Sequence, residues 1–153
     1  MEFVIEARPY GDPDVVRMVA DVQAEYVVLY GGPDEAVVDP DEFVPPNGLL
    51  LVGLVDGEPV AMGGWRRMSD TVAEIKRMYV SKPARRRGYS RRMLAEIERR
   101  AAAAGIAELI LNTGPEQPEA VALYEQSGYT VIPGFGHYAD HPHALFYGKP
   151  TAR

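Results

Sequence analysis

The densest chemical signal in the sequence is a basic segment between residues 76 and 100. This segment contains ten Lys and Arg side chains and two Glu, a formal charge of +8 in a chain whose net charge is −6. The rest of the chain therefore carries a formal charge of −14. A basic block in an acidic protein indicates an anionic partner, and the candidates are a nucleic acid, an anionic membrane or a phosphorylated small molecule.

The centre of this segment has the residue order of a phosphate-binding loop. An apolar run that ends at Val80 is followed by Pro83, by Arg85-Arg86-Arg87-Gly88, and then by a helical pattern. The first N–H groups of a helix have no partner within the helix, and the helix dipole adds positive charge there. Gly88 allows a close backbone approach, and Ser90 is small. The sequence has neither a P-loop nor a GxGxxG pattern, so this would be a different kind of phosphate site.

The elements that would position this loop follow from hydrophobic spacing and turn residues. Apolar runs predict strands at residues 3–7, 49–55, 59–66, 71–80, 106–111, 129–132 and 144–147. Helical spacing predicts helices over residues 13–29, 88–104 and 119–126. Asp56-Gly57 predicts a tight hairpin. The proline-rich, acidic segment 31–48 predicts an irregular loop that is functional or mobile.

The loop and its flanks resemble the GNAT N-acetyltransferase superfamily. Arg85-Arg86-Arg87-Gly88-Tyr89-Ser90 is similar to the family's Gln/Arg-x-x-Gly-x-Gly/Ala signature, with Ser90 as the departure, and residues 123–129 resemble its LYEKxGF segment. The order of elements also agrees, so the resemblance covers nearly the whole chain. It implies an α+β fold in a single domain, residues 1–153. The implied sheet is mixed and mostly antiparallel, has about seven strands and about four flanking helices, and is splayed between strands 4 and 5.

The resemblance implies acetyl-CoA as cosubstrate and a set of residues that bind it. Met78 and Val80 would offer backbone groups to the pantetheine arm, and the basic loop would hold the pyrophosphate. Gln117 stands where the family usually has an asparagine, seven residues before the tyrosine of its conserved segment. The implied cofactor-binding residues are Met78, Tyr79, Val80, Arg85, Arg86, Arg87, Gly88, Tyr89, Ser90, Arg91, Arg92, Asn112, Gln117 and Tyr124.

The implied reaction is direct attack of a primary amine on the thioester in a ternary complex. An alkyl ammonium with a pKa of about 10.4 must first lose a proton, which costs roughly 4.6 kcal/mol at pH 7, so a general base is useful. Glu74 occupies the strand position of the base in some family members. A strand carboxylate paired with a neighbouring arginine is the alternative interpretation. Tyr124 matches the family's general acid near the departing sulfur, with a packing role as its alternative.

The acceptor would be the amine of a small molecule or peptide. Candidate substrate-binding residues are Tyr26, Tyr30, Trp65, His137 and Tyr138, although core packing is the alternative for the first three. The acidic loop 34–42 is hypothesised to attract cationic amines. All three histidines fall within residues 137–143, but Pro142 and the loop setting predict no metal site.

Composition narrows the other possibilities. The absence of cysteine excludes thiol nucleophiles and Cys-ligated metals. The longest apolar run is far too short for a membrane span, and the acidic start does not resemble a signal peptide, so the sequence predicts a cytoplasmic protein with no membrane partner. A non-catalytic acyl-CoA-binding sensor is the alternative function. Nucleic-acid binding is less favoured because the remaining chain is acidic. Exposed strands near the C-terminus make a homodimer feasible.

Overall fold

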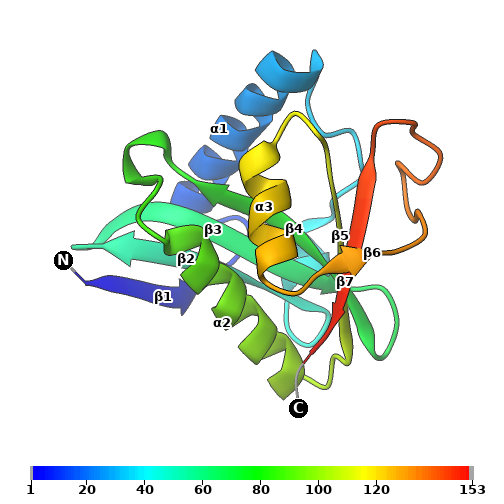
Figure 1. Cartoon of the computed structure of the whole chain (residues 1–153). Helices are drawn as coiled ribbons and strands as arrows, with labels where there is room; N and C mark the ends of the chain where they lie inside the picture. The colour runs from blue at the N-terminus through cyan, green and yellow to red at the C-terminus, as the bar shows by residue number, and fades with distance from the viewer. Residues whose placement is uncertain (1, 152–153) are drawn as a thin grey trace.

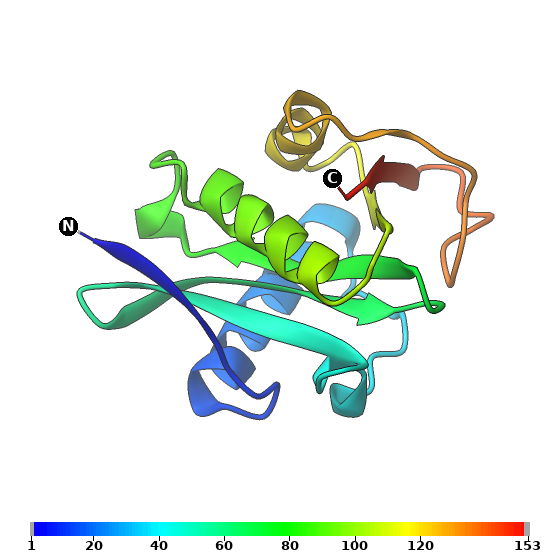
Figure 2. The same ribbon diagram turned by 90° about the horizontal axis from the view of Figure 1, so that it is seen from below.

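The computed structural model describes residues 2–151, which form one seven-stranded sheet with helices on both faces (Figures 1 and 2). Helix α1 (Pro13–Tyr30) and the short 3-10 helix η1 (Pro40–Phe43) cover one face. Helices α2 (Tyr89–Ala103) and α3 (Pro118–Gln126) cover the other face. The strands are β1 (Phe3–Ala7), β2 (Gly48–Val55), β3 (Glu58–Arg67), β4 (Val72–Val80), β5 (Glu108–Thr113), β6 (Thr130–Val131) and β7 (Leu145–Pro150).

The sheet has the order β1-β2-β3-β4-β5-β7-β6, and β4–β5 is its parallel pair. That pairing extends over three residues of each strand, from Val72 opposite Glu108 to Glu74 opposite Ile110. Beyond this point β4 continues to Val80 and β5 to Thr113 without pairing with each other. The sheet therefore opens between β4 and β5, as predicted.

Each face of the sheet has its own apolar core. Met93, Leu94 and Ile97 of α2 pack on one face. Val15, Met18 and Val22 of α1 pack on the other face, with Phe43 of η1. Such burial is the main stabilising force on each helix, because isolated helices of this length are marginal in water.

A bulge in β4 changes which residues face each core. Ala73 and Ile75 pack on the α2 face, but after Arg77 it is Met78 and Val80 that do so. Arg77 has a φ of 64°, and the register with β3 shifts at this place. An extra residue in one strand bends it and reverses the alternation of side chains. The bulge lies where β4 leaves β5.

Local signals located most elements correctly. Asp12 caps α1 with Pro13 in its first turn, and Asp56-Gly57 joins β2 to β3. The described residues contain three α-helices and two 3-10 helices, η1 and η2 (Lys82–Ala84), where about four helices were expected. Strand β5 begins two residues later than predicted, because Ile106 N still donates to Ala101 O at the end of α2. The segment 31–48 is not wholly irregular, since Asp39 caps η1 within it.

Candidate functional site

Two cavities meet where β4 and β5 separate. The first, of about 460 Å³, is the tyrosine-lined cavity, which has Tyr26, Tyr30 and Tyr138 on its walls. The second, of about 510 Å³, is the arginine-lined cavity, which has Arg85 and Arg86 on its walls. The residues common to both linings are Met78, Gln117, Ala120 and Tyr124. The two cavities therefore lie next to each other at the opening between the strands.

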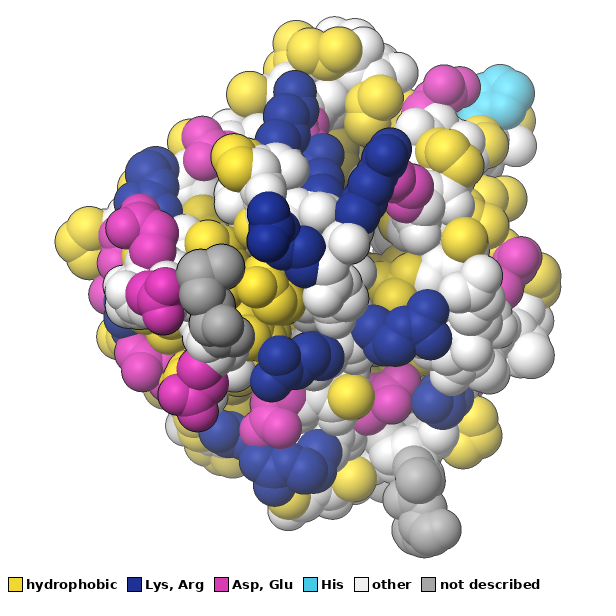
Figure 3. Space-filling model, turned by 60° about the vertical axis from the view of Figure 1, so that its left-hand side comes forward, with side chains coloured by type: hydrophobic (Ala, Val, Ile, Leu, Met, Phe, Trp, Pro, Cys, Tyr) yellow, Lys and Arg dark blue, Asp and Glu magenta, His cyan; other side chains and the backbone are white. Residues whose placement is uncertain are grey.

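The loop that borders the arginine-lined cavity turns through two left-handed residues. Arg86 has a φ of 67° and Gly88 a φ of 82°. Gly88 is the N-cap of α2, where no side chain of residues 2–151 accepts from the free N–H groups. An uncapped helix N-terminus that opens to solvent suits a phosphate group. Figure 3 shows Lys and Arg side chains spread over the face that carries this loop and α2, with Asp and Glu among them.

The basic side chains of this segment have different surroundings. Arg85 lines the arginine-lined cavity and is fixed by Val80 O at 2.7 Å and Glu25 Oε2 at 2.6 Å. Arg86 also lines it, and Arg87 is exposed. Arg91 instead donates to Gln126 Oε1.

Arg92 and Tyr89 both pack against β1. The Arg92 guanidinium donates to Phe3 O and lies over the Phe3 ring, on which Tyr89 stacks at 4.3 Å. The hypothesis that Arg92 contacts a phosphate is therefore not favoured. Ser90 and Tyr79 line the arginine-lined cavity, as does Val80, whereas Asn112 lines the tyrosine-lined one.

Tyr124 lies at the junction of the two cavities. It is buried on α3, with its ring edge-on to Tyr129 at 5.6 Å. No hydrogen bond among the described residues involves its hydroxyl, although it lines both cavities. Burial raises the pKa of Tyr124 well above the ordinary value for tyrosine. The hydroxyl thus remains protonated and free to donate a hydrogen bond.

Glu74 lies outside both cavities and is paired with an arginine. Its Oε1 accepts from Arg66 Nε at 3.0 Å and lies 2.9 Å from Nη2. The same guanidinium bonds Glu42 and the carbonyl of Val37, so it ties η1 and the preceding loop to the sheet. Glu74 is only 3% exposed. The structure favours the interpretation of Glu74 as a structural ion-pair partner over that of a general base.

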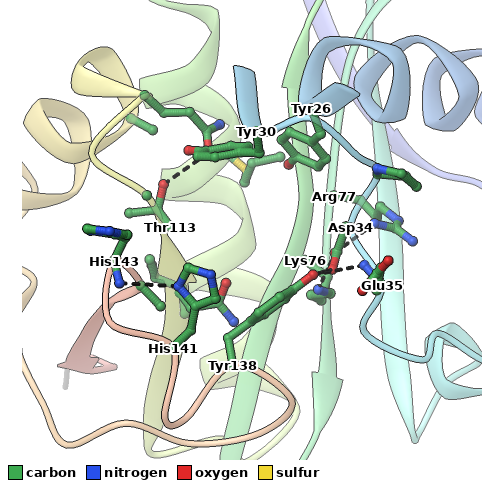
Figure 4. Close-up of a pocket in the computed structure, with 18 of the residues that line it drawn as sticks. Tyr26, Tyr30, Asp34, Glu35, Lys76, Arg77, Thr113, Tyr138, His141 and His143 are labelled. Atoms are coloured by element: carbon green, nitrogen blue, oxygen red, sulfur yellow. Dashed lines mark hydrogen bonds and ion pairs between the residues drawn. The ribbon is translucent and has the colours of Figure 1, made fainter. Parts of the chain in front are cut away.

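The structure places some of the candidate substrate-binding residues at the tyrosine-lined cavity and others away from it. Tyr26, Tyr30 and Tyr138 line the tyrosine-lined cavity, whereas Trp65 is packed in the α2-side core and His137 lies outside the lining. Two histidines that sequence reasoning did not select, His141 and His143, line it instead (Figure 4). Both are on the loop between β6 and β7, and only the folded path of that loop shows which imidazoles face inward. Burial and the nearby Asp34 raise the pKa of Tyr26 to about 12, so this phenol stays neutral at physiological pH.

An ion cluster of Asp34, Lys76 and Arg77 forms one wall of this cavity. Asp34 Oδ2 lies 2.8 Å from Lys76 Nζ and 3.2 Å from Arg77 Nη1. Tyr138 donates to Asp34 Oδ1 at 2.9 Å and accepts from Glu35 N at 2.8 Å (Figure 4). Burial alone raises the pKa of Asp34, but Lys76, together with the hydrogen bonds from Ala36 N and Tyr138, outweighs burial and lowers that pKa below the ordinary value. Asp34 is thus an ionised counter-ion rather than a proton acceptor.

Three of the five carboxylates in the acidic loop are engaged by other residues. Asp34 is neutralised by the cluster, Glu42 pairs with Arg66, and the Asp39 side chain caps η1. Of the two loop carboxylates that line the tyrosine-lined cavity, Asp34 is thus engaged, and the exposed Glu35 is the one left to attract a cationic amine. Within residues 2–151, no group of three His, Cys, Asp or Glu is arranged to hold a metal, and none of the described helices is long and apolar enough to cross a membrane.

A Trp65→Phe variant separates the core from the acceptor interpretation of Trp65. The indole is 2% exposed, and its Nε1 has no partner within the described residues. Phenylalanine removes an unpaired donor and leaves a small void. The loss of stability should therefore stay below the roughly 3–5 kcal/mol that truncation of a buried Trp to alanine costs. The KM for the acceptor should not change, because the side chain does not line the cavity. A steady-state acceptor titration checks this, and an increase in that KM would return Trp65 to the site.

Comparison with known proteins agrees with this arrangement. The model of the acetyltransferase (GNAT) family matches residues 16–129. A protein named IAA acetyltransferase from Azospirillum brasilense is 32% identical over 137 residues, which cover 89% of this chain and 90% of that protein. The chain therefore belongs to the GNAT acetyltransferase family, which confirms the predicted family and enzyme class.

Solved structures agree with the fold. An acyl-CoA N-acyltransferase structure from Klebsiella pneumoniae matches with a TM-score of 0.84 and 25% identity, covering 98% of both chains. A GNAT acetyltransferase from Elizabethkingia anophelis, solved with acetyl-CoA bound, matches with a TM-score of 0.71 at 14% identity and covers 97% of both chains. The second likeness concerns the fold alone, and it shows that this architecture accommodates acetyl-CoA in that protein.

Proposed function

We propose that the protein is an acetyl-CoA-dependent N-acetyltransferase that acts on a primary amine in a ternary complex. The supporting observation is the pair of cavities that meet at Tyr124 and Met78 through the opening between β4 and β5. In this proposal the arginine-lined cavity takes acetyl-CoA and the tyrosine-lined cavity takes the amine. Residues 1–153 are taken as one domain in the cytoplasm, and a homodimer stays a prediction.

The residues around the arginine-lined cavity fit a phosphate-bearing cofactor. The loop offers left-handed backbone at Arg86 and Gly88, an uncapped start of α2, and Arg85 on the cavity wall. A Cβ at Gly88 would meet no atom within 4 Å, so the loop is open there. When bound, acetyl-CoA supplies an acetyl group activated as a thioester. The proposed role of Tyr124 is to donate a hydrogen bond from its hydroxyl to the departing sulfur.

Direct transfer is favoured over a covalent acyl-enzyme formed on a thiol. The chain contains no cysteine, so no cysteine thiolate is available as an intermediate nucleophile. The amine and the thioester must then be held together, which the meeting of the two cavities allows. Initial-rate kinetics with both substrates varied should give intersecting lines, and parallel lines would contradict direct transfer.

A thiol-release assay tests the function itself. Acetyl-CoA is offered with polyamines, aminoglycosides, amino acids and peptides, and free thiol is followed spectroscopically. Acceptor-dependent release supports an enzyme. If calorimetry detects acetyl-CoA binding but no acceptor causes release of thiol, the non-catalytic sensor is favoured. Strongly salt-dependent binding to DNA would instead support nucleic-acid binding.

A Gly88→Ala variant tests the phosphate loop. Alanine at a φ of 82° costs about 1–2 kcal/mol, which the loop can relieve only by moving. We expect the KM for acetyl-CoA to rise about tenfold, the equivalent of about 1.4 kcal/mol. Gly105→Ala is the matched control, because Gly105 has a φ of 89° and equally open surroundings at the other end of α2. Equal changes in KM for both variants would contradict a phosphate role for Gly88.

A further inference from the structure

The ion cluster of Asp34, Lys76 and Arg77 contains more positive than negative charge. Two cations share one carboxylate, and the three side chains are only 7%, 6% and 12% exposed for Lys76, Arg77 and Asp34 respectively. The buried cluster thus carries a formal charge of +1. Burying a charge without a counter-ion is costly, so this wall favours an additional anion.

The cluster also has hydrogen-bond donors to spare. Within the described residues, Lys76 Nζ donates one hydrogen bond, to Asp34. Arg77 donates from Nε to Tyr10 Oη and from Nη1 to Asp34. An ammonium has three donors and a guanidinium five. Lys76 and Arg77 both line the tyrosine-lined cavity, so an anion entering that cavity would come beside these two cations.

The other charged groups on the cavity wall do not cancel this excess to the same extent. Glu35 lines the cavity, but it is exposed, so water and salt screen its charge. His141 and His143 add imidazoles and no carboxylate to the wall. The hydroxyl of Tyr138 is already engaged with Asp34 and Glu35 N. Lys76 and Arg77 are therefore the buried positive groups on the wall of this cavity, and their excess charge is not cancelled there.

We infer that the acceptor is an amine that also carries a carboxylate, as an amino acid does, and that Lys76 and Arg77 bind this carboxylate. The inference rests on the proposed function and names its substrate class. The bound carboxylate neutralises the ion cluster. Four tyrosines line the same cavity, and they suit an aromatic substituent on the acceptor. L-phenylalanine is therefore the first probe.

The experiment compares L-phenylalanine with L-phenylalaninamide in the wild-type protein and in Lys76→Met. Loss of a hydrogen bond to a charged group should lower kcat/KM for phenylalanine roughly 10- to 150-fold. The amide lacks the carboxylate, so its kcat/KM should fall much less. The readout is the ratio of kcat/KM for phenylalanine to kcat/KM for phenylalaninamide, compared between Lys76→Met and the wild type. Differences in the pKa of the two amines cancel in this comparison.

Lys76→Met is chosen because Asp34 and Arg77 remain as a neutral pair, so no carboxylate is left buried without a partner. Lys149→Met is the matched control. Lys149 also pairs with a carboxylate, that of Glu98, but it belongs to β7 and lines neither cavity. The control should leave the ratio of phenylalanine to phenylalaninamide turnover unchanged.

A measurement on the wild-type protein keeps the inference testable if Lys76→Met does not fold. 3-Phenylpropionate has the carboxylate without the amine and should inhibit competitively against the acceptor, whereas 3-phenylpropionamide should not. Equal inhibition by both compounds, an unchanged ratio in Lys76→Met, or faster turnover of diamines than of amino acids would overturn the inference. With any of these outcomes the protein would still bind acetyl-CoA and release thiol, so the proposed function would stand. Failure of the proposed function differs, since acetyl-CoA would then bind without release of thiol from any acceptor.

Discussion

A Glu74→Ala variant is expected to lose about 3–5 kcal/mol of its free energy of unfolding, because it removes the buried carboxylate that pairs with Arg66 and leaves the more exposed Glu42 as its carboxylate partner. Burial alone lowers the pKa of Arg66, and Glu74 and Glu42 together raise it above the ordinary value, which shows how far this cation depends on its carboxylates. The melting temperature should fall by roughly 6–20 °C, at about 2–4 °C per kcal/mol for a domain of this size. Thermal unfolding followed by circular dichroism measures it.

Glu6→Ala is the matched control for this loss. Glu6 is also a strand glutamate paired with an arginine, Arg8, but its side chain is 48% exposed. Exposed pairs contribute about 0–1 kcal/mol, so this variant should unfold close to the wild-type temperature. Similar losses for both variants would contradict the structural role of Glu74.

The milder variant Glu74→Gln tests the catalytic alternative. Glutamine keeps the size of the side chain and an oxygen that can accept from Arg66. Below its melting temperature, the variant should keep the wild-type kcat, because Glu74 lines neither cavity. A loss of about 10²-fold or more in a folded Glu74→Gln protein, the usual scale of general base catalysis, would restore Glu74 as the base.

The parts of the fold that the sequence predicts depend on short-range signals. The Asp12 cap, the Asp56-Gly57 turn and the left-handed Gly88 each act within a few residues, so their types are enough to place α1, the first hairpin and the start of α2. The opening between β4 and β5 is instead predicted by the resemblance to the GNAT family. Tyr124 is identified by the resemblance of residues 123–129 to the family's conserved segment.

The parts that the sequence does not predict depend on the bulge in β4 and on distant loops. Regular alternation along β4 puts Lys76 and Arg77 on opposite faces, whereas the bulge at Arg77 brings both beside Asp34, about forty residues away in the chain. Arg66 and Glu74 are opposite each other across β3 and β4, a pairing that the register alone determines. The inward-facing imidazoles of His141 and His143 depend on the path of an irregular loop. These contacts join residues that are far apart in the chain, so the residue types of one short segment do not predict them.

A Tyr124→Phe variant is expected to lose about 10²–10³-fold in kcat, the usual loss when one hydrogen-bond donor to a developing negative charge is removed. The phenol lies where the two cavities meet, and its hydroxyl has no hydrogen bond within the described residues. A thiol has a pKa of about 8.5 and tyrosine one of about 10, so full proton transfer to a thiolate is already uphill. Burial raises the pKa of Tyr124 further and makes the transfer harder still. The hydroxyl should therefore act as a hydrogen-bond donor to the developing negative charge on sulfur.

This role predicts which kinetic constants change and which do not. Acetyl-CoA affinity, measured by calorimetry, should be nearly unchanged in Tyr124→Phe because the ring and its contact with Tyr129 remain. Tyr129→Phe is the matched control, since its hydroxyl bonds Glu98 at 2.8 Å outside both cavities. That variant should lose about 1.5–3 kcal/mol of stability, because the bond is to a charged group, and keep its kcat. If kcat at saturating acetyl-CoA is the same in Tyr124→Phe as in the wild type, the hydroxyl takes no part in the transfer, and Tyr124 is a packing residue at the junction of the two cavities.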